Sequence, residues 1–162
     1  MQENLRLLGA LASGEPVYDR PCSHLHASVA GLLPEAFARI SSGGAQFLAH
    51  EVDFGRIVGE TTCVPTGEGD EVVWAQRPGR RGMTRFVKNR DPEPASTVVL
   101  ILKRDRFEPY YVLVTAFVGR QGGLEPWDPR ACKEDRKFWE GHALVYGSEP
   151  ILPETETGVC PW

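Results

Sequence analysis

The sequence lacks any long apolar run. Across its 162 residues, no hydrophobic stretch approaches the roughly 20 residues that a helix needs to span a bilayer. The opening residues, Met-Gln-Glu-Asn-Leu-Arg, also lack the basic start and continuous apolar core of a secretory signal. Together these absences predict a cytoplasmic protein that has no membrane partner.

Cysteine is scarce, and its four copies are widely separated. No C-x-x-C pair occurs among them: they stand at Cys22, Cys63, Cys132 and Cys160. In a chain of this length without an export signal, reduced thiols are more common than a disulfide framework.

One short run nevertheless holds three soft donors at alternating positions, Cys22, His24 and His26. Such donors can ligate zinc, but a structural zinc site needs a fourth ligand, and none lies nearby in sequence. We therefore expect no metal, with exposed histidines in an extended loop as the simpler interpretation.

Several motifs of common enzyme classes are also missing. There is no phosphate-cradling glycine loop followed by lysine, no nucleophile elbow and no H-E-x-x-H sequence. ATP-dependent phosphoryl transfer, serine hydrolysis and zinc proteolysis are thus disfavoured, and no cofactor is expected.

Acidic residues are absent from residues 77–90, although the chain as a whole carries a net charge of -4. We call this segment the basic strip. It holds six of the 18 basic residues: Arg77, Arg80, Arg81, Arg85, Lys88 and Arg90. A local field of one sign can steer an anion toward an otherwise acidic protein. The alternative is a solvated loop that faces acidic residues elsewhere in the fold.

The first 46 residues are predicted to form a helical segment. Leucines at positions 5, 7, 8 and 11 give an apolar stripe over residues 1–14, which Ser13-Gly14 ends. A second helix is expected over residues 33–40, with Pro34 in its first turn. These helices could pair with those of a second copy, which would make a homodimer.

From Phe47 onward the sequence has the composition typical of β-strands. Short β-branched stretches are predicted as strands over residues 47–59, 61–65, 71–76 and 83–88, with a turn at 67–70 joining two antiparallel strands. The apolar runs 97–103 and 110–118 predict a central hairpin. A short helix at 131–139, a strand at 142–146 and an extended tail at 150–162 complete the prediction. The expected fold class is α+β, with N-terminal helices packed on a central antiparallel sheet formed within residues 47–149.

A histidine on an early strand and the basic strip suggest chemistry on RNA. Histidine exchanges protons near neutral pH, and arginine offers a planar fork of donors that fits a phosphate. These are the parts of metal-independent RNA cleavage, in which the 2′-hydroxyl attacks its own phosphorus. The predicted catalytic residues are His50, Arg81, Arg85 and Thr115. Further predicted substrate contacts are Arg77, Arg80, Thr84 and Lys88.

The order of these elements resembles a known superfamily. An early His-bearing strand, a basic strand and a hairpin that includes Ser96–Leu100 and Tyr111–Phe117 are similar to the barnase–EndoU–colicin–RelE-like (BECR) toxin-type ribonucleases. The resemblance covers residues 47–120. It implies an early His, a central cation and a late hydroxyl followed by an aromatic residue, which match His50, Arg81 or Arg85, and Thr115 with Phe117. Residues 124–129 and 138–146 match no motif of that superfamily, which indicates a distinct bacterial family built on the same sheet.

A second group of residues follows the hairpin. Trp127 and His142, with Glu125, Asp128 and Trp139, could line a pocket in which tryptophan stacks on a base or a sugar. Alternatively, Trp127 and Trp139 close the end of the sheet, and this is the favoured interpretation because large aromatics are most often packed.

Three functions therefore remain open: a ribonuclease, a non-catalytic binding module that holds RNA or another anionic partner, and a dimerising scaffold. Regular strand alternation would place Arg81 and Arg85 on one face and Thr84 with Lys88 on the other. We expect the face with Arg81 and Arg85 to bind the ligand.

Overall fold

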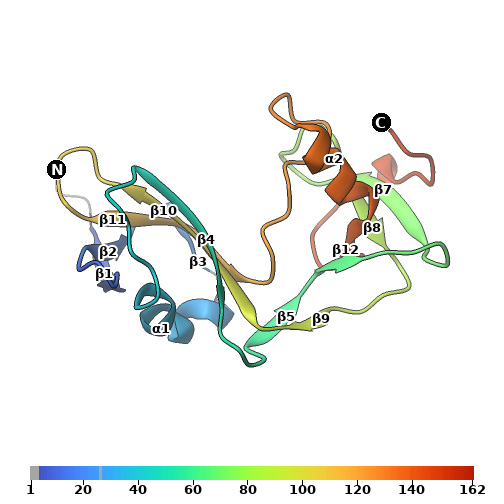
Figure 1. Ribbon diagram of the computed structural model, residues 1–162. Coiled ribbons are helices and arrows are strands. Elements are labelled where there is room, and N and C mark those ends of the chain that lie inside the picture. Colours follow the sequence, from blue (N-terminus) through green and yellow to red (C-terminus); the bar gives the residue numbers. More distant parts are fainter. Residues whose placement is uncertain (1–3, 26) are drawn as a thin grey trace. The chain divides into compact units, whose positions relative to one another are not determined.

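A computed structural model describes residues 4–25 and 27–162 (Figure 1). The chain divides into two compact units, and each unit is assembled from two separated stretches. Unit 1 comprises Met1–Gly59 with Pro94–Arg120, and unit 2 comprises Glu60–Glu93 with Gln121–Trp162. This division does not follow the predicted boundaries after residues 46 and 149.

Unit 1 is built on a six-stranded sheet. Its strands are β1 (Arg6–Ala10), β2 (Pro16–Asp19), β3 (His24–Leu25), β4 (Phe47–Asp53), β10 (Thr97–Arg104) and β11 (Tyr111–Val118). The order is β1-β2-β11-β10-β4, and β3 also pairs with β11. β10 and β11 form the predicted antiparallel hairpin, whereas β2 and β3 run parallel to β11. The N-terminal stretch therefore belongs to the same sheet as the hairpin.

Two short helices cover one face of this sheet, η1 (Ala27–Leu32) and α1 (Leu33–Phe37) (Figure 1). Pro34 stands in the first turn of α1, where its missing N–H costs nothing, and α1 lies inside the predicted helix at 33–40. Leu33 and Phe37 belong to the same buried cluster as Leu100 of β10 and Leu113 of β11. This cluster is the hydrophobic core of unit 1.

The predicted fold class is wrong. Strands hold 36% of the described residues and helices only 14%, and the strands form three sheets. The predicted N-terminal helix is replaced by β1, which pairs with β2. Leucines spaced along so short a segment fit a strand as well as a helix, and pairing with β2 decides the outcome. The homodimer was predicted to form through two N-terminal helices, and the first of these is a strand in the structure.

Unit 2 contains a four-stranded sheet in the order β6-β12-β8-β7. These strands are β6 (Cys63–Pro65), β7 (Val72–Gln76), β8 (Met83–Val87) and β12 (His142–Val145). The turn at 67–70 exists, with the Asp70 amide donating to the Gly67 carbonyl at 3.2 Å. However, the strands that flank it, β6 and β7, stand at opposite edges of the sheet, so the predicted pairing across this turn is wrong.

The remaining elements of the chain are short. α2 (Lys133–Glu140) forms close to its predicted position, and η2 (Pro153–Thr155) lies in the predicted tail. β5 (Gly59–Thr61) and β9 (Glu93–Ala95) make a two-stranded sheet where the chain passes from one unit to the other. None of the helices in the described residues has the length and apolar character to cross a membrane.

The tail lies along the outer edge of β7. The Leu152 amide donates to the Gln76 carbonyl at 2.8 Å, and Thr157 and Trp74 exchange two backbone hydrogen bonds of 2.8 Å. These bonds satisfy backbone groups that β7 would otherwise expose at a sheet edge.

The core of unit 1 gives a direct test of the sheet register. Replacing the fully buried Leu100 by alanine removes apolar contacts and leaves a cavity, so we expect a loss of about 2–5 kcal/mol in the free energy of unfolding. Ile101 lies next to it on the opposite, partly exposed face, and Ile101→Ala should cost clearly less. Urea denaturation followed by circular dichroism measures both, and equal losses would contradict this register.

Candidate functional site

The register of β7 and β8 divides the basic strip between two faces of the sheet. Trp74 pairs with Arg85 and Ala75 pairs with Thr84. Paired residues share a face and consecutive residues alternate, so Thr84 and Arg85 point to opposite sides. The predicted separation of these two side chains is therefore present in the structure.

Thr84 lies in a buried polar cluster. Its hydroxyl is fully buried and donates to one carboxylate oxygen of Glu125, while the Nε of Arg77 donates to it at 3.1 Å. Arg77 also pairs with the other Glu125 oxygen at 2.9 Å, and both side chains are largely covered, at 18% and 12% exposure. Arg77 and Thr84 thus bind to each other and to Glu125, which leaves little of either for a ligand.

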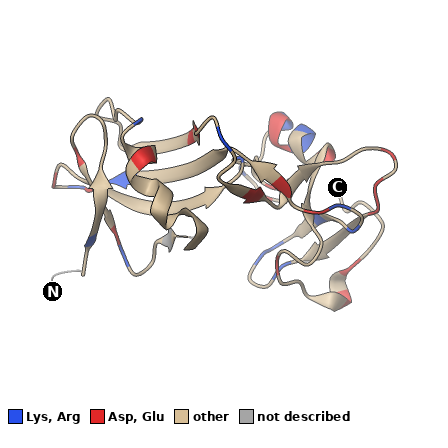
Figure 2. Ribbon diagram, turned by 90° about the horizontal axis from the view of Figure 1, so that it is seen from below, with Lys and Arg blue, Asp and Glu red and all other residues tan. Residues whose placement is uncertain are grey.

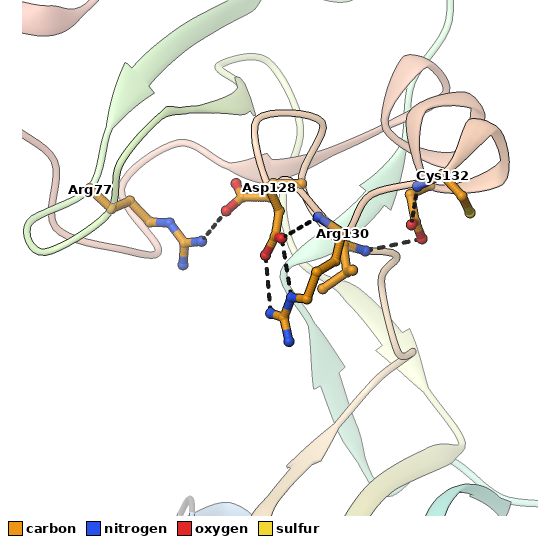
Figure 3. A network of polar contacts seen from close by, with 7 residues as sticks. Arg77, Asp128, Arg130 and Cys132 are labelled. Carbon is orange, nitrogen blue, oxygen red and sulfur yellow. Dashed lines mark hydrogen bonds and ion pairs between the residues drawn. The ribbon is translucent and has the colours of Figure 1, made fainter.

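The loop that supplies Glu125 continues into a second ion pair and the start of α2. Arg130 pairs with Asp128 at 3.2 Å, and the Cys132 amide donates to Asp135 at 2.9 Å (Figure 3). The Arg130 guanidinium and the Arg130 amide lower the pKa of Asp128. These contacts are local to the loop, and the bonds of Glu125 to Arg77 and Thr84 join the loop to the sheet.

Trp127 and Trp139 are packed. A Cβ built on Gly82 would lie only 2.2 Å from the Trp127 ring, so this indole lies directly on the backbone at Gly82. Trp139 is 6% exposed, and its indole N–H donates to the Gly123 carbonyl at 2.9 Å. These contacts agree with the interpretation that both tryptophans close the sheet.

His142 begins β12 and stacks on Phe138 of α2, with ring centroids 4.0 Å apart. Its Nδ1 lies 2.9 Å from the Phe138 carbonyl, which can only accept, so Nδ1 carries a proton.

Arg85 occupies the other face of the sheet. Its Nη1 donates to the Thr66 hydroxyl at 2.7 Å and to the His142 carbonyl at 2.9 Å, and both of these acceptors are neutral. Burial lowers the pKa of Arg85, opposed by the nearby Cys160 and Asp70. An arginine remains charged despite such a shift, so Arg85 is a fixed, half-buried cation.

The six cations of the basic strip fall into two groups. Arg77, Lys88 and Arg90 pair with Glu125, Glu156 and Asp70, at distances of 2.9, 3.5 and 2.8 Å. Within the described residues, no carboxylate lies within 4.0 Å of Arg80, Arg81 or Arg85. Acidic and basic segments occur together in unit 2 (Figure 2). The alternative interpretation of the strip, a surface that faces acids elsewhere, therefore holds for three of its six cations.

The predicted catalytic residues are distributed over the two units. His50 lies on β4 and Thr115 on β11 in unit 1, whereas Arg81 and Arg85 belong to unit 2. Within unit 1, Leu100 pairs with His50 and Ala116, and its neighbour Ile101 pairs with Ala49 and Thr115. His50 and Thr115 therefore point to opposite faces of the same sheet, and the structure does not bring their side chains together.

The possible zinc donors Cys22, His24 and His26 are not favoured as a metal site by the sequence, and no group of three or more such ligands that could hold a metal ion occurs in the described part of the chain. Cys22 is a free, exposed cysteine and His24 begins β3, while His26 lies outside the described residues.

Sequence reasoning missed Trp74 and Thr66 as neighbours of Arg85. Trp74 and Arg85 lie at equal distances from the middle of the 77–82 loop, and this symmetry would have paired them once β7 and β8 were treated as a hairpin. Thr66 follows β6, which reaches β8 only through β12, so no local signal identifies it.

Comparison of the chain with protein families, curated proteins and solved structures found no match.

The packing of Trp127 gives a testable consequence for the Thr84 side. Gly82→Ala places a methyl group on the Trp127 ring, which must shift, so we expect a loss of about 1–3 kcal/mol in unfolding free energy. Gly67→Ala is the matched control, because open space surrounds Gly67. Thermal unfolding of both variants measures the difference, and a Gly82→Ala protein as stable as the control would refute the packed position of Trp127.

Proposed function

We propose that unit 2 binds an anionic, phosphate-bearing ligand through Arg85, with Arg80 and Arg81 drawing the ligand toward it. The observation that carries this proposal is the state of Arg85, a half-buried cation held by two neutral acceptors. No carboxylate in the described chain lies within ion-pair distance of its guanidinium.

The free donors of Arg85 support this function. Both side-chain hydrogen bonds of Arg85 use Nη1, which leaves Nε and Nη2 without a hydrogen bond to the described residues. A guanidinium presents such donors as a rigid fork that suits a phosphate. Partial burial strengthens the interaction, because the screening by water is reduced.

The exposed cations add long-range electrostatic attraction for an anionic ligand. Arg80 and Arg81 lie in the exposed loop that precedes β8, and neither forms an ion pair within the described residues. Exposed charges of this kind raise the rate of encounter with an anion more than they raise its affinity. RNA, the partner expected from the sequence, carries a row of phosphates on which such charges act together.

RNA cleavage, the function predicted from the sequence, is the second candidate function. The register pairs Leu144 of β12 with Phe86 of β8, so the His142 side chain lies on the Thr84 face of the sheet and Arg85 lies on the other face. A ribonuclease that holds the phosphate with Arg85 would therefore need a proton acceptor other than His142.

Binding of a short fluorescent RNA, followed by anisotropy, tests the first proposal. Arg85→Ala should weaken binding about tenfold or more, because a hydrogen bond to a charged group contributes about 1.5–3 kcal/mol. Arg85→Lys keeps the charge but loses the fork and should give only partial recovery. Lys137→Ala, which removes an exposed charge from α2 in the same unit, is the control and should bind like the parent protein. An affinity that does not depend on salt concentration, or an equal loss of affinity in Arg85→Ala and Lys137→Ala, would rule out the Arg85 site.

Incubation of the protein with tRNA in EDTA tests the catalytic candidate. Cleavage products should form without metal and disappear in Arg85→Ala, and their loss in His50→Ala as well would favour the site predicted from the sequence. Intact tRNA in every sample would leave binding as the function.

A further inference from the structure

The end of the described chain returns to the face of unit 2 that carries Arg85. Thr157 is held to Trp74 of β7 by two backbone hydrogen bonds of 2.8 Å. Beyond this point the Trp162 ring lies edge-on to the Trp74 ring, with centroids 6.2 Å apart and an interplanar angle of 86°. The C-terminal segment is seen beside β7 in Figure 1.

Trp74 and Arg85 are close neighbours on that face. Because both backbone groups of Trp74 bond to Thr157, Trp74 and Arg85 form a non-hydrogen-bonded pair of β7 and β8. Side chains approach more closely in such pairs than in hydrogen-bonded ones. A residue that covers Trp74 therefore also lies beside Arg85, and Cys160 is near enough to raise the pKa of this guanidinium.

The segment 158–162 is held weakly. Val159 is 74% exposed, and its amide bonds only to the Thr157 hydroxyl at 3.2 Å. The Cys160 thiol donates within the segment, to the Trp162 carbonyl at 3.2 Å. Among the described residues, no backbone hydrogen bond joins 158–162 to β7. Its attachment to the sheet after Thr157 thus depends mainly on the ring contact of Trp162.

The Trp74 indole N–H is buried and has no hydrogen-bond partner among the described residues. A buried donor without a partner is unfavourable, and displacement of the covering ring would make this donor available to solvent or to a ligand. The donor lies on the same face as the free nitrogens of Arg85.

We propose that residues 158–162 form a strap that covers Arg85 and Trp74, and that an anionic ligand displaces this strap when it binds. The strap regulates the site proposed above and therefore depends on that proposed function for its biological meaning. Its closed state competes with the ligand, so the apparent affinity falls by the fraction of molecules in which the strap is closed.

The magnitude follows from the contact that holds the strap. An aromatic pair contributes about 0.5–1.5 kcal/mol beyond area burial, which corresponds to a factor of about two to twelve. Trp162→Ala should accordingly open the strap and tighten ligand binding by about two- to tenfold. Val159→Ala is the matched control in the same segment, because the Val159 side chain is exposed.

Chemical labelling tests the strap without any ligand. Phenylglyoxal modifies accessible guanidinium groups, and mass spectrometry of the intact protein and its peptides reports the rate at Arg85. We expect Arg85 to react several-fold faster in Trp162→Ala than in the parent protein or in Val159→Ala, while Arg80 reacts equally in all three. An unchanged rate at Arg85 would overturn the strap, whether or not the protein binds RNA.

Anisotropy with the fluorescent RNA forms the second arm. Tighter binding in Trp162→Ala, with no change in Val159→Ala, supports displacement of the strap by the ligand. Equal or weaker binding in Trp162→Ala overturns it. Faster labelling of Arg85 combined with no RNA binding in any variant contradicts the proposed function and leaves the strap intact as a cover, so the two failures are distinguishable.

Discussion

The register of β8 between β7 and β12 determines the chemistry of unit 2. Pairing of Ala75 with Thr84 and of Trp74 with Arg85 sends consecutive side chains to opposite faces. A slip of one residue would bury the Arg85 cation where Thr84 now lies, next to Glu125, and would expose the Thr84 hydroxyl on the other side. The Glu125 cluster, the position of Arg85 on the opposite face and its neighbour Trp74 all follow from this single register.

The sequence predicts much of the β-structure because the signals are local. The apolar runs of β10 and β11 are long and β-branched, and the polar residues between them mark the hairpin that the structure contains. α1 was predictable from Pro34, since proline is tolerated only in the first turn of a helix. Each of these signals lies within the element that it specifies.

The first helix was predicted incorrectly because the deciding interactions are not local. β1 pairs with β2, and β2 pairs with β11, almost 100 residues further along the chain. At Gly9 the backbone passes so close to Phe37 of α1 that a Cβ would lie 3.0 Å from the ring. A leucine stripe contains no information on either contact. The partner of Arg77 was hidden in the same way, because Glu125 follows it by 48 residues and reaches it through the fold.

Arg77 and Arg85 lie eight positions apart, yet their surroundings suit them to different tasks. A ligand that bound Arg77 in place of Glu125 would leave the largely covered Glu125 carboxylate without its cation. Removal of one partner from a buried ion pair costs about 3–5 kcal/mol of stability. Arg85 bonds to neutral acceptors, so an anion at its free nitrogens leaves no charge uncompensated. One such contact contributes about 1.5–3 kcal/mol, whereas micromolar affinity requires about 8 kcal/mol. A ligand that binds well must therefore make contacts beyond Arg85, which favours a chain of phosphates over a single small anion.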